Sequence, residues 1–262
     1  MKNSKKLLIV AGAAGEIGTE YCKMAIAHEV NCIGIVRNRK TGIKSPFFTE
    51  VVCDLDKEAS IHESFADIDF TEYKEIIYLH TIGIDNFDPR GYPNIELLKT
   101  IPLEIYDSNV NSFKYLLRYC GMKISALNDG RRDSKISLKI AIIAGVSDKY
   151  TPFVIEPFCE AKFILRQYIQ SYIQLHPDWI SGLSINITST ITASALRVRP
   201  HADTTYWLQP SEVVQKSFET LISKARKYKE MDIIKNFPDF IPGYYMSNKD
   251  LYEKWSRETG VK

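Results

Sequence analysis

The chain has 262 residues, of which 45% are hydrophobic, enough to form a full hydrophobic core. Its 34 lysines and arginines nearly balance 32 aspartates and glutamates, so the net charge of +2 argues against a nucleic-acid-binding groove. No apolar run approaches the roughly 20 residues of a membrane-spanning helix. The five cysteines are scattered and form no CxxC pair. We therefore expect a cytoplasmic protein with no disulfide framework and with no nucleic-acid or membrane partner.

Short apolar runs alternate with helical patterns along the chain. The predicted strands span 7–11, 31–36, 50–53, 75–79, 140–144 and 182–187, and the predicted helices span 19–28, 57–66, 104–120 and 157–175. Short buried strands that alternate with helices indicate a parallel sheet covered on both faces. No linker or repeat divides the chain. We therefore predict one α/β domain over residues 1–262, a Rossmann-type doubly wound parallel sheet in three α/β/α layers.

Three polar segments lie outside these elements. Residues 128–133 are interpreted as an exposed loop before the fifth strand. The cationic cluster at 226–229 is interpreted as the end of a helix, where the helix dipole favours positive charge. Residues 189–210 carry Thr, Arg, His, Asp and Trp207. We expect them to form a loop or lid on the substrate side.

A glycine-rich turn joins the first strand to the first helix. Gly12, Gly15 and Gly18 are spaced by three, and Glu16 and Ile17 lie between the last two. A strand that turns through glycines into a helix presents bare backbone N–H groups at the positive end of a helix dipole, which receives a pyrophosphate. These five residues are therefore predicted to bind a dinucleotide cofactor.

The end of the second strand indicates which dinucleotide is preferred. Enzymes that bind NAD usually carry an acidic residue there, which holds the ribose hydroxyls. This chain has Arg37, Asn38 and Arg39 instead. A guanidinium group binds a 2′-phosphate well, whereas a carboxylate would repel it. The sequence therefore favours NADP(H) over NAD(H), although a solvated surface loop would also account for the two arginines.

Two further strand ends are predicted to contact the cofactor. Asp54 and Leu55 follow the third strand, where an aspartate can accept a hydrogen bond from an adenine amino group. A helix N-cap is the competing interpretation of Asp54. His80 ends the fourth strand at the carboxyl edge of the sheet, and we expect it to pack beneath the nicotinamide.

In these motifs the chain resembles the short-chain dehydrogenase/reductase superfamily over most of its length. The glycine spacing and Val36-Arg37-Asn38 are similar to its extended and atypical branches. Asn109 matches the asparagine of the family's fourth helix, and Lys162 matches the active-site lysine that opens the fifth. Residues 210–213 resemble the start of a late helix, and residues 241–245 resemble the last strand. The resemblance implies a homo-oligomer formed through helices 104–120 and 157–175.

The chain departs from the family at the catalytic positions. Family members reduce carbonyls with a Tyr-x-x-x-Lys pair, in which the tyrosine gives the proton. Here Phe158 stands in place of that tyrosine, and Gly145 stands in place of the serine that hydrogen-bonds the carbonyl. The Pro-Gly pair usually found after the sixth strand is also absent. Asn109 and Lys162 remain, so the chain can be expected to bind the cofactor even though it lacks the proton donor for catalysis.

Three functional hypotheses follow. The favoured one is an NADP(H)-binding protein without the Ser/Tyr proton-donor pair that acts as a non-catalytic sensor or partner. The alternative is an NADP(H)-dependent oxidoreductase acting on a carbonyl, an alcohol or a nucleotide-sugar-like substrate, with Ser147 or Tyr150 as the substitute acid. Tyr206 or His201 could also supply the acid from the later loop, although each of these four residues could equally be an ordinary surface or packing residue. The third is a scaffold whose pocket is a relic. The histidines show no metal-ligand spacing, and no Gly-x-Ser-x-Gly elbow supports a hydrolase.

Overall fold

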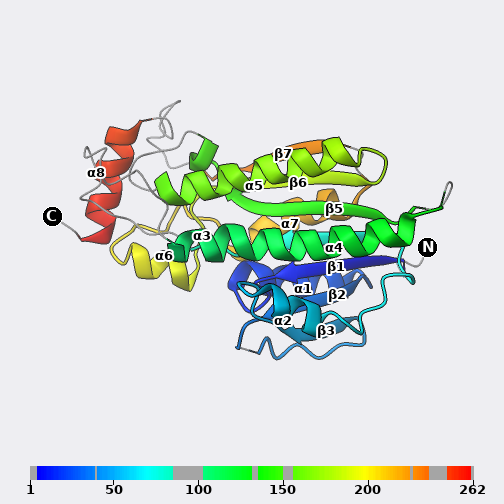
Figure 1. Cartoon of the computed structure of the whole chain (residues 1–262). Coiled ribbons are helices and arrows are strands. Elements are labelled where there is room, and N and C mark those ends of the chain that lie inside the picture. Colours follow the sequence, from blue (N-terminus) through cyan, green and yellow to red (C-terminus); the bar gives the residue numbers. More distant parts are fainter. Residues whose placement is uncertain are drawn as a thin grey trace.

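A seven-stranded parallel sheet forms the centre of the computed structural model, with the strand order β3-β2-β1-β4-β5-β6-β7 (Figure 1). The structure describes residues 5–38, 40–84, 103–131, 135–149, 156–224, 227–235 and 247–260. The strands are β1 Lys6–Ala11, β2 Asn31–Val36, β3 Phe48–Val52, β4 Glu75–His80, β5 Ser137–Gly145, β6 Ile180–Ile187 and β7 Tyr228–Ile233. The predicted doubly wound parallel sheet is confirmed.

Helices cover both faces of this sheet. They are α1 Glu16–Ala27, α2 Glu58–Ser64, α3 Leu103–Tyr106, α4 Ser112–Asn128, α5 Glu156–Leu175, α6 Ala193–Val198, α7 Pro210–Ile222 and α8 Asn248–Thr259. Side chains of α1 and α7 form the core on one face, and those of α4 and α5 form the core on the other. Among the helices that the structure describes, none combines the length and the apolar composition needed to cross a membrane.

The order of the strands places a crevice at the carboxyl edge of the sheet. β1 pairs with β2 on one side and with β4 on the other, so the connections leave β1 and β4 in opposite directions. Ligands of open α/β sheets bind at this reversal point. In Figure 1, α6 and α8 lie beyond the carboxyl ends of the strands, next to this crevice.

The seventh strand corrects the interpretation of the cationic cluster at 226–229. Tyr228 and Lys229 belong to β7 and not to the end of a helix, while Arg226 lies outside the described residues. β7 is the last strand of the sheet, and it leaves Lys229, Glu230 and Asp232 largely uncovered. Because an edge strand needs no continuous apolar run, its charged sequence does not have the pattern of a buried strand.

The predicted loop at 128–133 also needs correction. Asn128 is the last residue of α4 and is buried. Its amide accepts a hydrogen bond from Ile136 N (2.7 Å) and donates one to Ile136 O (2.9 Å), so it joins the helix end to the start of β5. Residues 132–134 and the predicted last strand at 241–245 lie outside the described residues. Pro210 begins α7, as the resemblance implied.

A buried lysine at the amino edge of the sheet gives a pH-dependent stability. Lys139 is 1% exposed, and its Nζ donates hydrogen bonds to the carbonyl oxygens of Leu221 (2.6 Å) and Ser223 at the end of α7. Burial lowers the pKa of Lys139 to about 8, although Glu75, 3.8 Å away, opposes the shift. Nearby Lys6 reinforces the shift.

Because lysine in an unfolded chain has a pKa of about 10.4, the unfolded state binds more protons than the folded state above pH 8. The free energy of unfolding should therefore rise with pH between about pH 8 and pH 10, by up to about 3 kcal/mol from this group. Urea unfolding across that range, compared with Lys139→Met, measures the contribution. Parallel pH profiles for the two proteins would contradict the lowered pKa.

Candidate cofactor site

Close backbone packing forms the glycine turn. Gly12 adopts φ +85, and a methyl group there would lie 2.8 Å from Thr81 Oγ1. A methyl group on Gly18 would overlap the carbonyl oxygen of Gly12. Gly15 caps α1, and no side chain of the described residues accepts a hydrogen bond at that cap. The first N–H groups of α1 therefore have no capping side chain from Gly15 and remain available to a pyrophosphate.

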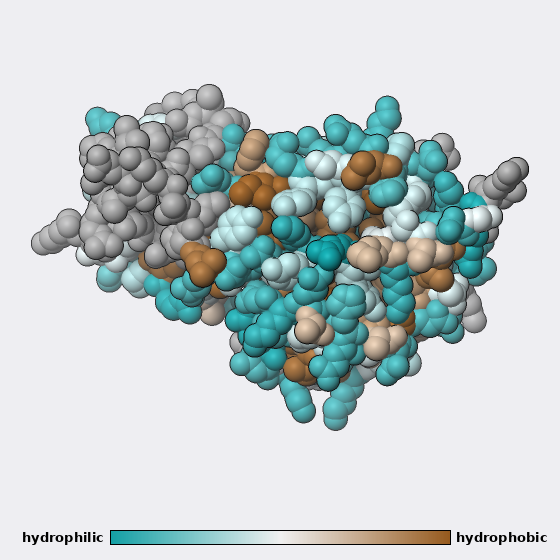
Figure 2. Space-filling view, viewed as in Figure 1, coloured by the Kyte–Doolittle hydropathy of each residue, from teal (hydrophilic) through white to brown (hydrophobic). Residues whose placement is uncertain are grey.

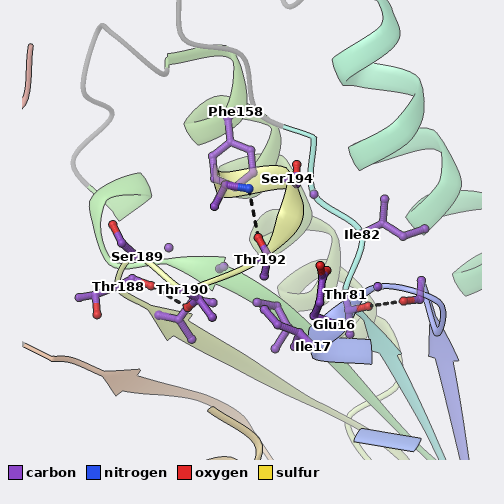
Figure 3. A pocket seen from close by; sticks show the side chains of 18 of the residues that line it. Glu16, Ile17, Thr81, Ile82, Phe158, Thr188, Ser189, Thr190, Thr192 and Ser194 are labelled. Atoms are coloured by element: carbon purple, nitrogen blue, oxygen red, sulfur yellow. Dashed lines mark hydrogen bonds between the residues drawn. The ribbon is translucent and has the colours of Figure 1, made fainter. Parts of the chain in front are cut away.

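A cavity of about 360 Å³ extends from this turn to Gly145, Phe158 and Lys162, the positions that match catalytic residues of short-chain dehydrogenases. Its lining includes nine residues that the sequence singled out: Gly12, Gly15, Glu16, Ile17, Gly18, Gly145, Ser147, Phe158 and Lys162. Figure 3 shows Glu16, Ile17 and Thr81 on one side of the cavity and Thr188, Ser189 and Thr190 on the other. The structure thus brings the predicted phosphate turn and the predicted lysine into one cavity.

Lys162 is held in place by a backbone carbonyl and an aromatic ring. It is 1% exposed, and its Nζ donates a hydrogen bond to Ile82 O (2.9 Å). The same Nζ lies 5.2 Å from the ring centroid of Phe158, within the range of a cation–π interaction. Gly83 lies next to this pair, because a methyl group added to it would be 3.4 Å from Lys162 Nζ and 3.4 Å from Phe158 Cε2. Phe158 therefore occupies the position beside the lysine, but it has no proton to donate.

Asn109 supports the segment that bonds Lys162. It lies in a π-helical turn, Asp107–Asn111, between α3 and α4. Its Oδ1 accepts from Ile84 N (3.2 Å), and its Nδ2 donates to Ile84 O (3.0 Å) and to Ile105 O (2.9 Å). Asn109 does not line the cavity. It fixes the chain that leaves β4 and thereby the carbonyl that Lys162 bonds.

Ser147 lies beside the side chain that Gly145 lacks. A methyl group on Gly145 would be 3.5 Å from Ser147 Oγ and 3.5 Å from Asp148 Oδ2. Gly145 N donates to that carboxylate (2.5 Å), whose other oxygen pairs with Arg166 (2.5 Å). Burial raises the pKa of Asp148, and Arg166 opposes the shift. A buried ion pair therefore fixes the turn that carries Ser147, whereas Tyr150 lies outside the described residues.

Arg37 stands apart from the cavity, at the end of β2. Its Nη2 lies 2.6 Å from Asp56 Oδ2, and its Nε lies 3.6 Å from Asp54 Oδ1. A hydrogen bond from Lys57 lowers the pKa of Asp54, whereas burial raises the pKa of Asp56 against the charge of Arg37. Asn38 is exposed beside Arg37. A positive group thus lies at the end of β2, where the sequence predicts contact with the ribose of a dinucleotide, but two carboxylates share it.

Two other predicted contacts, Leu55 and His80, lie outside the cavity. Leu55 is a core residue, 4% exposed. His80 is fully buried, and its Nδ1 lies 3.0 Å from Tyr78 Oη. Burial and the charge of Lys162 lower the pKa of His80, so the ring is neutral at pH 7. Arg39 lies outside the described residues. His80 is therefore part of the buried core at the end of β4.

The segment from 188 to 199 covers the cavity. Thr192 caps α6 by accepting from Ala195 N (3.1 Å), and Ala193 N donates to Glu16 Oε1 (2.9 Å) across the cavity mouth. Arg199, from the predicted lid, and Trp255, from α8, also line the cavity. Trp255 could not be predicted from the sequence, because no local pattern relates α8 to the glycine turn. The alternative candidates Tyr206 and His201 do not line the cavity.

No family model matches the sequence. The search of curated proteins also found no match. Solved structures do match the fold. A serine dehydrogenase from Escherichia coli superposes with a TM-score of 0.65 at 14% identity, covering 87% of this chain and 97% of the other. A short chain dehydrogenase from Burkholderia cenocepacia J2315, in complex with NADP, gives 0.68 at 11% identity, covering 97% and 99%. The fold is that of the short-chain dehydrogenases.

A third structure extends this comparison. A 3-ketoacyl-(acyl-carrier-protein) reductase from Brucella melitensis, complexed with NADH, gives a TM-score of 0.68 at 14% identity, covering 88% of this chain and 98% of the other. The residues present here fit a dinucleotide, because the turn at Gly12 and Gly18 has no room for a side chain and the cap of α1 faces the cavity. Within the described ranges, no group of three or more His, Cys, Asp or Glu side chains could hold a metal ion.

Proposed function

We propose that this protein binds NADP(H) between the glycine turn and Lys162 and does not reduce carbonyl compounds, acting as a sensor or as a partner subunit. The observation that carries the proposal is the cavity itself, in which the phosphate turn and the buried lysine are present while Phe158 and Gly145 supply no hydroxyl. The structures of the same fold that hold NADP and NADH support a nicotinamide dinucleotide as the ligand, and Arg37 is the reason to propose NADP(H). A cytoplasmic location is part of the proposal.

Each side chain has a separate task in this proposal. The bound nicotinamide is the group that can accept or supply a hydride. Lys162 offers an ammonium group, oriented by Ile82 O, to ribose hydroxyls. Phe158 fills the place beside the lysine with an apolar ring. Without a donor near a developing oxyanion, carbonyl reduction would lose about 10²–10⁴ in rate.

Replacing Arg37 by alanine should weaken NADPH binding about 10–100-fold and leave NADH binding almost unchanged, since only NADPH carries the 2′-phosphate. Titration of both cofactors by calorimetry measures the two dissociation constants. Asp56→Asn is the matched variant of opposite sign, because it removes the carboxylate 2.6 Å from the guanidinium.

The Arg37 side chain in that pair is 57% exposed, so the pair is weak and a phosphate can displace Asp56. Asp56→Asn should therefore tighten NADPH binding only about threefold. Equal affinity of the wild type for NADPH and NADH, unchanged in both variants, would refute the NADP preference. Failure of both cofactors to bind would refute the proposed function.

A second function is supported by one specific observation, the position of Ser147. Its Oγ lies 3.5 Å from the site of a side chain on Gly145, so it can present a hydroxyl close to where the family presents its serine. The protein would then be an NADP(H)-dependent oxidoreductase for a carbonyl, an alcohol or a nucleotide-sugar-like compound, with Ser147 or Tyr150 in the donor role. NADPH oxidation across a carbonyl panel that falls in Ser147→Ala would favour this function over the first.

We also propose a homo-oligomer formed through α4 and α5, the helices that correspond to the predicted 104–120 and 157–175. Met122 and Phe163 on these helices are 62% and 54% exposed. Figure 2 shows separate brown patches among teal atoms over this face. Tyr115 and Tyr168, in contrast, pack against the core. Light scattering on the wild type and on Phe163→Glu tests the assembly, and a monomeric wild type would refute it.

A further inference from the structure

Arg199, at the end of α6, is a buried cation that contacts two indole rings. It is 5% exposed, and its guanidinium carbon lies 4.2 Å from the ring centroid of Trp207 and 4.2 Å from that of Trp255. Both distances are well within the range of a cation–π interaction, and a planar guanidinium stacks on aromatic faces where a lysine cannot. Trp207 follows α6, whereas Trp255 belongs to α8. The arginine therefore joins two separate parts of the chain.

The edges of the same guanidinium reach two further partners. Nη1 lies 3.2 Å from Glu258 Oε2, and the two side chains are 6% and 9% exposed. Nη2 donates to Ser189 Oγ (3.1 Å), in the loop that follows β6. Removal of the arginine would leave Glu258 as a buried carboxylate without this partner, which is unfavourable. Loss of Arg199 should thus loosen α8 and the β6 loop together.

The buried face of α8 carries the two residues that contact Arg199, Trp255 and Glu258. Among the α8 side chains that the structure describes, the buried ones are Leu251, Trp255 and Glu258, at spacings of four and three that place them on one side of a helix. The backbone strengthens the attachment, because His201 N donates to Glu258 O (2.9 Å). Trp255 and Arg199 both line the cavity that contains the glycine turn and Lys162. The wall of the cavity opposite the sheet is therefore assembled around Arg199.

We infer that Arg199 is a positioning residue that makes the C-terminal helix α8 a wall of the cofactor cavity, by holding Trp255 and Ser189 in register around the ligand. The inference rests on the proposed function, since it concerns the same cavity. It adds that ligand affinity depends on a helix from the far end of the chain. Residues that touch the cofactor directly are not enough to form the site.

Energy transfer from tryptophan to the nicotinamide of bound NADPH tests the inference. Trp255→Phe should reduce the transfer, because Trp255 lines the cavity; Trp207, which contacts the same guanidinium, accounts for the remainder. Trp179→Phe is the matched control. Trp179 precedes β6 at the amino edge of the sheet, roughly 25 Å from the carboxyl edge for an eight-residue strand. The control should retain the transfer.

Arg199→Met should weaken NADPH binding about tenfold and reduce the transfer. Arg199→Lys should fall between Arg199→Met and the wild type, because it keeps the charge for Glu258 but not the planar stacking. A lower melting temperature with unchanged NADPH affinity and transfer would reduce Arg199 to a structural role and overturn the inference. If Arg199→Met does not fold, Ser189→Ala and Trp255→Phe test the inference in its place. NADPH affinity and transfer equal to the wild type in both would overturn it.

Acrylamide quenching of tryptophan in the absence of NADPH separates this inference from the proposed function. When both proteins carry Trp207→Phe, stronger quenching in Arg199→Met than in the protein with Arg199 shows that Trp255 has lost its packing on the guanidinium and supports the inference, even if the wild type binds no NADPH. Equal quenching in the two proteins overturns it. A wild type that binds neither cofactor refutes the proposed function by itself.

Discussion

Replacing Gly18 by alanine is expected to destabilise the protein by about 3 kcal/mol and to abolish NADPH binding. The new methyl group would overlap the carbonyl oxygen of Gly12 and lie 2.9 Å from its carbonyl carbon and 3.0 Å from Ala13 Cα. All three atoms are backbone, so no side chain can rotate away. Overpacking of this kind typically costs 1–3 kcal/mol and occasionally more. Relief would have to come from a shift of the turn, which would move the N–H groups that face the cavity.

Gly15→Ala is the matched control for this change. A methyl group on Gly15 would meet only Gly12 O, at 3.3 Å, on an exposed turn with an ordinary negative φ of −78. The melting temperature should stay within about 1 °C of the wild type. In Gly18→Ala it should fall by several degrees, at about 2–4 °C per kcal/mol for a chain of this size. Thermal unfolding and NADPH titration of both variants suffice. A Gly18→Ala protein with the stability and affinity of the wild type would contradict the close packing of the turn.

The buried strands could be predicted from the sequence because the sheet is parallel and covered on both faces. Every residue of β4 is buried, and its central residues 76–79 form a continuous apolar run between Glu75 and His80. β7 could not be predicted in this way. Its residues Glu230 and Asp232 form ion pairs with Lys149, which lies in a turn far away in the sequence. The charged side chains of β7 are stabilised by a partner that is brought near them only when the chain folds.

The candidate site was predictable where its parts follow strand ends in order. Gly12 and Gly18 follow β1, and Lys162 lies on the helix after β5, so local spacing was enough to place them in one cavity. The rest depends on contacts between distant segments. Arg199 pairs with Glu258, 59 residues later, and Glu16 bonds Ala193 N, 177 residues later. No local sequence pattern predicts such contacts. The residues that cover the cavity could therefore be predicted only as a polar segment, 189–210, of unknown structure.

Restoring both missing hydroxyls, with Phe158→Tyr and Gly145→Ser, is expected to raise the rate of NADPH-dependent carbonyl reduction by about 10²–10⁴ over the wild type. Position 145 has room for a side chain. A side chain on Gly145 would meet its nearest neighbours at 3.5 Å, and Gly145 is not among the described residues with positive φ. The Phe158 ring already lies 5.2 Å from Lys162 Nζ, so a phenol there would be within the influence of that charge. Steady-state NADPH oxidation over a panel of aldehydes and ketones measures the gain.

The third substitution Lys162→Met in the same background is the matched control, and it should remove the gained activity. Phe158→Tyr alone should gain less, unless the hydroxyl of Ser147, 3.5 Å from the side-chain position of Gly145, already serves the carbonyl. In that case the single and double variants would be equally active, and the second of the two proposed functions would be favoured. A double variant that binds NADPH with the affinity of the wild type yet reduces no carbonyl on the panel would contradict the expectation. The fault would then lie in the covering wall around Arg199 and Trp255, since the cofactor and both hydroxyls would be in place.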